Sequence, residues 1–111
     1  MPRRRKPELE WAEPAQDDLE AIRAYIALDS TVAADRFIAR LKRAALNLRR
    51  FPYSGEVLRV DERGQVREIY VRSYKVIFHR SDEKIQILAV IHGARNIPRD
   101  LLEWSDPDEV E

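Results

Sequence analysis

Hydrophobic residues along this chain change their spacing near residue 57, from a helical period to a strand period. Within residues 14–50 they recur every three or four positions, in two runs separated by Leu-Asp-Ser-Thr at 28–31. This spacing places the apolar side chains on one face of each of two helices. The first face comprises Ala15, Leu19, Ile22 and Ile26, and the second comprises Ala34, Phe37, Ile38, Leu41, Ala45 and Leu48. The pattern predicts a helical hairpin over residues 14–50.

Capping and breaking residues mark the ends of these two helices. Pro14 suits the first turn of a helix, where its missing N–H costs nothing. Ser30 or Thr31 can cap the second helix, because either hydroxyl can accept a hydrogen bond from the first turn. Pro52 and Gly55 follow the second run and are expected to end it.

Alternating apolar and polar residues predict strands on both sides of the helical region. An N-terminal strand at residues 8–12 has Leu9 and Trp11 on one side. After the helices the sequence contains four further strand candidates, at residues 56–60, 66–71, 74–79 and 84–92. The last two flank the polar stretch Arg-Ser-Asp-Glu at 80–83, which is typical of a β-hairpin.

The last strand candidate is apolar on both of its alternating faces, so we expect it to be central in its sheet and covered by helices on one side. The predicted fold is therefore α+β, with an N-terminal strand and a helical hairpin packed on a largely antiparallel β-sheet. A length of 111 residues fits one domain spanning 1–111.

Composition favours a cytoplasmic location. The chain has no cysteine, and its longest apolar run, at residues 87–91, is far shorter than the roughly 20 residues that a membrane helix needs. The basic opening residues lack the apolar stretch of a secretory signal. We expect no membrane association.

Charge is segregated along the chain although the net charge is zero. Residues 1–99 carry all 20 Lys and Arg and 14 acids, whereas the acidic C-terminal tail at 100–111 carries six acids and no base. A basic body suggests an acidic or anionic partner. A tail that only aids solubility explains the same pattern. The basic N-terminal end at 2–7 is interpreted either as a disordered solubilising end or as a polyanion-binding segment.

Enzyme motifs are scarce in this sequence. Three glycines in all leave no glycine-rich phosphate loop, and neither His79 nor His92 has a nucleophile partner or metal-ligand spacing nearby. We therefore expect no metal and no cofactor. A structural role at a hairpin end is predicted for His79, while both a structural and a functional role stay open for His92, which leads into a glycine turn.

Two sets of cations are candidates for binding. Arg95 follows Gly93 closely and precedes Pro98, so we expect its guanidinium to be held at the sheet edge, where it can grip a phosphate, a carboxylate or the chain's own acids. A second set repeats every three or four residues in the second helix, and comprises Arg36, Arg40, Arg43, Asn47 and Arg50. These residues form one basic face, which either binds a partner or is solvated. No aromatic residue is interleaved there, so base stacking is not indicated.

The chain resembles the RelE/ParE superfamily of toxins from type II toxin–antitoxin systems over nearly its whole length. The resemblance lies in "LEWAEPAQDDLEAI", in "LRRFPYSGEVLR", in "VREIYVRSYKVIFHRSDEKIQILAVIHGARNIP" and in the order of the elements. It is closer to the ParE-like branch, which implies inhibition of DNA gyrase, growth arrest and plasmid stabilisation. A RelE-like ribosome-dependent mRNA endonuclease is the alternative, and a non-toxic module that only binds its antitoxin is a third.

The resemblance can be carried to single positions. Two family arginines are matched by Lys75 and Arg95. The paired lysines of the RNA-cleaving branch fall on Glu68 and Tyr70, and its late tyrosine falls near Leu101. Since a carboxylate in place of a lysine depletes the cation cluster, the gyrase interpretation is preferred. For a nuclease, the catalytic candidates are Lys75, Arg95, His92 and Tyr70.

The resemblance also implies a cognate antitoxin with an acidic, partly disordered segment, in a toxin–antitoxin hetero-oligomer. The candidate binding residues for the target or the antitoxin are Lys75, His92, Arg95, Arg36, Arg40 and Arg43. A further hypothesis is that the acidic tail, with its Leu101, Leu102 and Trp104, lies on the basic surface of its own chain.

Overall fold

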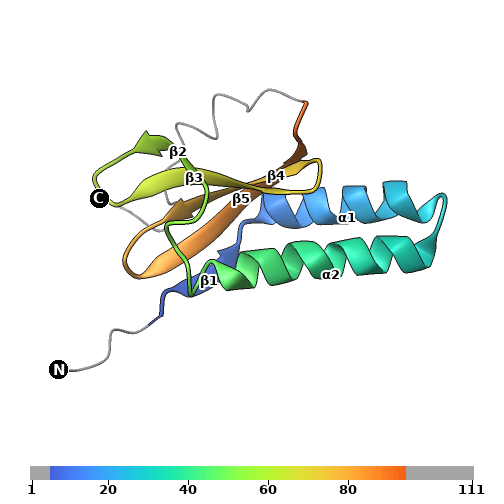
Figure 1. Ribbon diagram of the computed structural model, residues 1–111, viewed down its shortest axis with the longest axis horizontal. Helices are drawn as coiled ribbons and strands as arrows, with labels where there is room; N and C mark the ends of the chain where they lie inside the picture. The colour runs from blue at the N-terminus through green and yellow to red at the C-terminus, as the bar shows by residue number, and fades with distance from the viewer. Residues whose placement is uncertain (1–5, 95–111) are drawn as a thin grey trace.

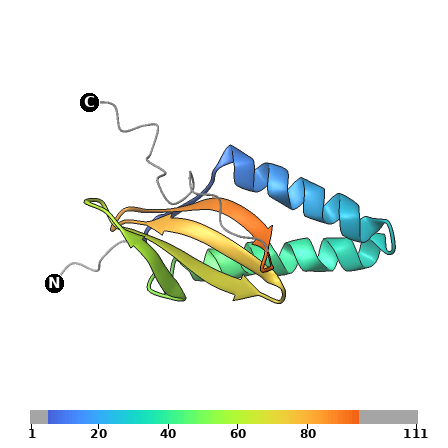
Figure 2. The ribbon, with the colours of Figure 1, turned by 90° about the horizontal axis from the view of Figure 1, so that it is seen from above.

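The computed structural model describes residues 6–94, which form a helical hairpin packed on one face of a five-stranded sheet. The elements are β1 (Glu8–Trp11), α1 (Glu13–Ala27), α2 (Thr31–Asn47), β2 (Glu56–Val60), β3 (Gln65–Val71), β4 (Tyr74–Arg80) and β5 (Lys84–His92). Figures 1 and 2 show the two layers, with the free end of the hairpin projecting beyond the sheet. The predicted α+β class is confirmed. Most of the N-terminal end 2–7, Arg95 and the tail 100–111 lie outside the described residues.

The sheet is largely antiparallel, as predicted. Its strand order is β1-β5-β4-β3-β2, and β1 alone pairs in parallel, with β5. The expectation that β5 is interior is confirmed, although the middle position belongs to β4. The first and last strands of the described chain are therefore neighbours in the sheet, and β1 lies beside the first half of β5.

An irregularity in β5 accounts for its apolar residues on both faces. Ile77 of β4 pairs with Ala89, and the next residue, Phe78, pairs with Ile87, so Leu88 is an extra residue in β5. Such a bulge resets the alternation of side chains. Leu88, Ala89 and Ile91 therefore face away from the helices together.

The helix ends follow the predicted signals. Pro14 lies in the first turn of α1. Ser30, rather than Thr31, is the N-cap of α2, since its Oγ accepts a hydrogen bond from the backbone N–H of Ala33 at 3.1 Å. Gly55 has φ of 80°, and a Cβ at this position would lie 1.9 Å from the carbonyl oxygen of Glu68, so only glycine fits the turn into β2.

The main core lies between the hairpin and the sheet. Every residue of the two predicted helical stripes is buried or half-buried. From the sheet, Val71, Val76, Phe78, Ile85, Ile87 and Val90 complete this core. These side chains hold the helices at a fixed position over β4 and β5.

A second cluster of buried apolar side chains lies on the opposite side of the sheet, which we call the outer face. It comprises Val66, Ile77, Leu88, Ala89 and Ile91. Strand pairing extends the outer face to Glu68 and Tyr70 of β3 and to Lys75 and His79 of β4, because these residues alternate with the core positions.

Candidate functional site

The predicted basic face of α2 lines a groove beside the β3–β4 turn. Arg36, Arg40 and Arg43 are joined there by Arg72, and the rest of the lining is apolar: Ile26, Ala33, Phe37 and Ala39. None of these lining residues is acidic. We call this site, with a volume of about 630 Å³, the basic groove. Asn47 and Arg50 do not line it, and Arg50 instead lies over the Phe51 ring at 5.5 Å.

Helical spacing explains why three of these arginines gather. Steps of four and three residues bring their side chains onto one face of α2. Like charges at this spacing repel each other by a few tenths of a kcal/mol per pair. An anion in the basic groove would relieve that repulsion, so the site favours acidic ligands.

The fourth cation, Arg72, has an unusual backbone conformation. It lies in the two-residue turn between β3 and β4, with φ of 54°. A left-handed conformation costs a residue with a Cβ roughly 1–2 kcal/mol, and glycine or asparagine is the usual choice. The sequence indicated a positive φ here, because the predicted strands 66–71 and 74–79 leave only two residues for the turn and two-residue hairpin turns favour that conformation.

A row of ring contacts connects the basic groove to the end of β5. The Phe37 ring packs on Tyr74 with centroids 5.4 Å apart, and Tyr74 meets the edge of His92, also at 5.4 Å. His92 is exposed, and its Nδ1 accepts a hydrogen bond from the N–H of Ala94. His92 therefore lies on the helix side of the sheet, near the groove.

The nuclease candidates that the structure describes lie on both faces of the sheet. Tyr70 and Lys75 are direct partners across β3 and β4 on the outer face, whereas His92 is on the helix side. Arg95 lies outside the described residues. The resemblance to the family did not show that these residues lie on opposite faces of the sheet. The strand pairing shows it: His92 lies opposite Tyr74, and Tyr74 and Lys75, as neighbours in one strand, lie on opposite faces.

Glu68 stands beside Tyr70 on the outer face, in an environment that sequence reasoning missed. It is 8% exposed, and its Oε2 has no hydrogen-bond partner among the described residues. It pairs across the strands with Ile77, an apolar residue. A buried carboxylate in such surroundings repels phosphate groups and requires a cationic or hydrogen-bonding partner.

His79 contacts Asp61 at the end of β2. Its Nε2 lies 3.0 Å from Asp61 Oδ2, which also accepts a hydrogen bond from Arg59 at 2.8 Å. Asp61 Oδ1 accepts from the backbone N–H groups of Arg63 and Gly64 in the β2–β3 turn. Burial by itself raises the pKa of Asp61, but these hydrogen bonds outweigh it and lower the pKa from 3.8 to about 2.

Two buried arginines hold the loop before β2. Arg67 donates hydrogen bonds to the carbonyl oxygens of Tyr53, Ser54 and Gly55, and Arg80 lies 4.1 Å from the centre of the Tyr53 ring. These guanidinium groups are used within the protein. They therefore do not add to the cations offered to a partner.

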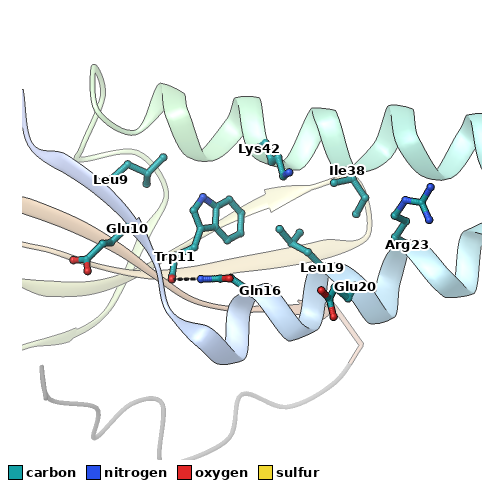
Figure 3. A pocket seen from close by; sticks show the side chains of 9 residues that line it. All are labelled: Leu9, Glu10, Trp11, Gln16, Leu19, Glu20, Arg23, Ile38 and Lys42. Carbon is teal, nitrogen blue, oxygen red and sulfur yellow. Dashed lines mark hydrogen bonds between the residues drawn. The ribbon is translucent and has the colours of Figure 1, made fainter.

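A second groove lies where β1 meets the two helices (Figure 3). Its apolar lining comprises Leu9, Trp11, Leu19 and Ile38, and its polar lining comprises Glu10, Gln16, Glu20, Arg23 and Lys42. Arg23 pairs with Asp35 at 2.9 Å and Glu10 with Lys84 at 3.1 Å. Because this β1 groove carries two acids and two bases, it is less selective for an acidic ligand.

Within residues 6–94 there is no group of three side chains suited to hold a metal ion. No helix in that part of the chain is long and apolar enough to cross a membrane.

The helical hairpin on a five-stranded, mostly antiparallel sheet is the fold of the RelE/ParE toxin superfamily. Residues 9–97 match the family described as ParE toxin of type II toxin–antitoxin system, parDE, and the chain belongs to this family.

Two relatives agree with this assignment. Toxin RelE2 of Caulobacter vibrioides (strain ATCC 19089 / CIP 103742 / CB 15) is 35% identical over 85 residues, which are 77% of this chain and 93% of that protein. A solved structure described as the chromosomal ParDE TA system from P. aeruginosa shares the fold, with a TM-score of 0.63 and 23% identity over 78% of this chain and 96% of that one.

Proposed function

We propose that this toxin inhibits DNA gyrase by binding it, and that it does not cut RNA. The carrying observation is Glu68, a buried carboxylate on the outer face, where the resemblance to the RNA-cleaving branch implies a lysine. Cleavage by attack of a 2′-hydroxyl needs a base, an acid and cations that stabilise developing negative charge. The negative charge of Glu68 opposes such stabilisation at that position.

An exposed apolar surface supports a protein target. Tyr25, Leu28 and Val32 lie at the free end of the helical hairpin and are 72%, 82% and 58% exposed. We call this surface the hairpin tip. Exposed apolar side chains that lie together commonly mark protein-binding surfaces.

The basic groove supports neutralisation by an antitoxin. A groove lined by four arginines and four apolar residues suits a peptide that alternates carboxylates with apolar side chains, since guanidinium groups bind carboxylates in a bidentate manner. The solved structure with this fold is a ParDE system, which agrees with a toxin–antitoxin complex. The proposed partner is a cognate antitoxin with an acidic, partly disordered segment.

RNA cleavage is the second candidate. Tyr70 and Lys75 are neighbours on the outer face and combine a phenol with an ammonium group. The relative from Caulobacter vibrioides bears the name RelE2. These two residues would supply an acid or base and one cation.

Pulse-labelling of DNA and protein synthesis, within minutes of inducing the toxin alone, separates the two candidates. An early fall of DNA synthesis with continued translation supports gyrase inhibition, which a supercoiling assay with purified gyrase then checks. Leu28→Glu should weaken inhibition in that assay, whereas Leu46→Glu, at an exposed site at the other end of α2, should not. Translation that stops first, and recovers with Tyr70→Phe or Lys75→Ala, contradicts the proposal. If neither synthesis falls although the protein is soluble, the chain is a non-toxic antitoxin-binding module.

A further inference from the structure

The basic groove and the hairpin tip meet at the free end of the helical hairpin. Ile26 and Ala33 line the groove, and their neighbours in the sequence, Tyr25 and Val32, belong to the tip. Both pairs lie where α1 ends and α2 begins. A ligand that reaches this end of the groove is therefore beside the exposed apolar side chains of the tip.

Helical spacing links the two surfaces a second time, through one row of side chains along α2. The row comprises Val32, Arg36, Arg40 and Arg43. Its steps of four, four and three residues bring these side chains to one side of the helix. At a rise of about 1.5 Å per residue the row is roughly 17 Å long. The row is cationic along the groove and becomes apolar at Val32, where it reaches the tip.

The charges around this surface determine the order of groups that a ligand must have. The three arginines of the row and Arg72 are exposed, and the rest of the groove lining is apolar. Asp29, in the connection between α1 and α2, is also exposed and places a negative charge at the tip. Carboxylates are therefore attracted to the groove and repelled at the tip, where apolar side chains fit better.

We propose that one segment of the antitoxin places its carboxylates along the basic groove and continues with apolar side chains over the hairpin tip, so that the antitoxin and the target compete for the tip. This inference rests on the proposed function, which assigns the tip to gyrase and the groove to the antitoxin. About five extended residues, or about eleven helical ones, span the row on α2. One short segment is therefore long enough to cover both surfaces.

The relative strength of the two kinds of contact explains why the segment extends beyond the groove. An exposed pair of an arginine and a carboxylate adds little affinity, because water and salt screen both charges. Burial of a large apolar side chain adds more. Tyr25 and Leu28 are 72% and 82% exposed, so the tip offers the larger gain. A segment that covers both surfaces binds more tightly than one confined to the groove, and it also blocks the target.

The antitoxin affinity of tip variants tests this placement. Isothermal calorimetry with the cognate antitoxin should show a loss of about 10-fold or more for Leu28→Glu and for Val32→Glu, because each puts a carboxylate into an apolar contact. Both positions are exposed, so circular dichroism should show an intact fold. Leu46→Glu, at the other end of α2, is the matched control and should change the affinity less than about 2-fold. Unchanged affinity in both tip variants would overturn the proposal.

The supercoiling assay with the same variants separates a failure of this inference from a failure of the proposed function. If Leu28→Glu weakens gyrase inhibition but keeps full antitoxin affinity, the target site stands and the shared surface is overturned. If Leu28→Glu loses antitoxin affinity but inhibits gyrase normally, the segment reaches the tip, and the assignment of the tip to gyrase fails together with the competition. Gel filtration of purified gyrase with the unaltered toxin and antitoxin gives a direct check. The antitoxin should release the toxin from gyrase, and a stable complex of all three proteins would contradict competition.

Discussion

The carboxylate of Asp18 on α1 accepts a hydrogen bond from the backbone N–H of Val90 on β5, at 2.9 Å. The sheet explains this contact between residues 72 positions apart. β1 ends at Trp11, whose partner in β5 is Ile87, so the next part of that β5 edge has no strand beside it. Asp18 thus replaces a missing strand at this point and joins the helical hairpin to the sheet.

We expect Asp18→Ala to lower the free energy of unfolding by about 1–3 kcal/mol, because it leaves a half-buried backbone N–H without its acceptor. Urea unfolding followed by circular dichroism measures the change. Asp18→Asn keeps an acceptor oxygen and should cost less. Asp17→Ala, at the exposed neighbouring position, is the control. Equal losses for Asp17→Ala and Asp18→Ala would show that the helix dipole, and not the contact with Val90, explains the effect.

The contact of Asp18 with Val90 is one of the features that the sequence did not predict. The sequence predicted both helical stripes and a cap at Ser30 or Thr31, because such features depend on residues a few positions apart. The bulge at Leu88, the Asp18–Val90 contact and the arrival of Arg72 at the basic groove depend on which strands become neighbours. That choice is made by packing of the whole chain and leaves no local pattern.

Arg72→Asn should raise stability and weaken antitoxin binding at the same time. Asparagine tolerates a positive φ better than arginine does, so the free energy of unfolding should rise by about 0.5–1 kcal/mol. Loss of one cation from the basic groove should weaken binding of the antitoxin about 2- to 10-fold. Thermal unfolding and isothermal calorimetry measure the two effects. Arg50→Ala, outside the groove, should leave the affinity unchanged, and an Arg72→Asn protein with undiminished affinity would exclude Arg72 from the interface.

Arg40→Ala should reduce antitoxin affinity and make it less sensitive to salt. Arg40 lies between Arg36 and Arg43 in the basic groove, so its removal takes away an attraction to the acidic peptide and also a repulsion within α2. We expect weaker binding with stability unchanged or slightly higher. Titrations at two salt concentrations check this. Lys42→Ala is the matched control, since Lys42 is exposed on the same helix but lines the β1 groove. If Lys42→Ala weakens binding more than Arg40→Ala does, the antitoxin uses the β1 groove instead.

The Asp61–His79 contact predicts a stability change at acid pH. The pKa of Asp61 is lowered from 3.8 to about 2 in the folded protein, so its ionised form stabilises the fold above pH 4. This contribution is lost as the pH falls from about 4 to about 2, because protonation of Asp61 then becomes favourable in the folded state as well. At neutral pH we expect Asp61→Asn to cost about 1–2 kcal/mol, less than the pKa shift alone implies, since the side chain is 25% exposed and water screens its charge.

Urea unfolding between pH 2 and pH 7 tests this for the unaltered chain and for Asp61→Asn. The difference in the free energy of unfolding between the two proteins should be constant above pH 5 and should shrink toward pH 2. Asp82→Asn, at a carboxylate that is 82% exposed and 3.9 Å from Arg80, should produce no such change. A difference that stays constant down to pH 2 would mean that asparagine fails for steric reasons, and that the charge of Asp61 does not stabilise the β2–β3 turn.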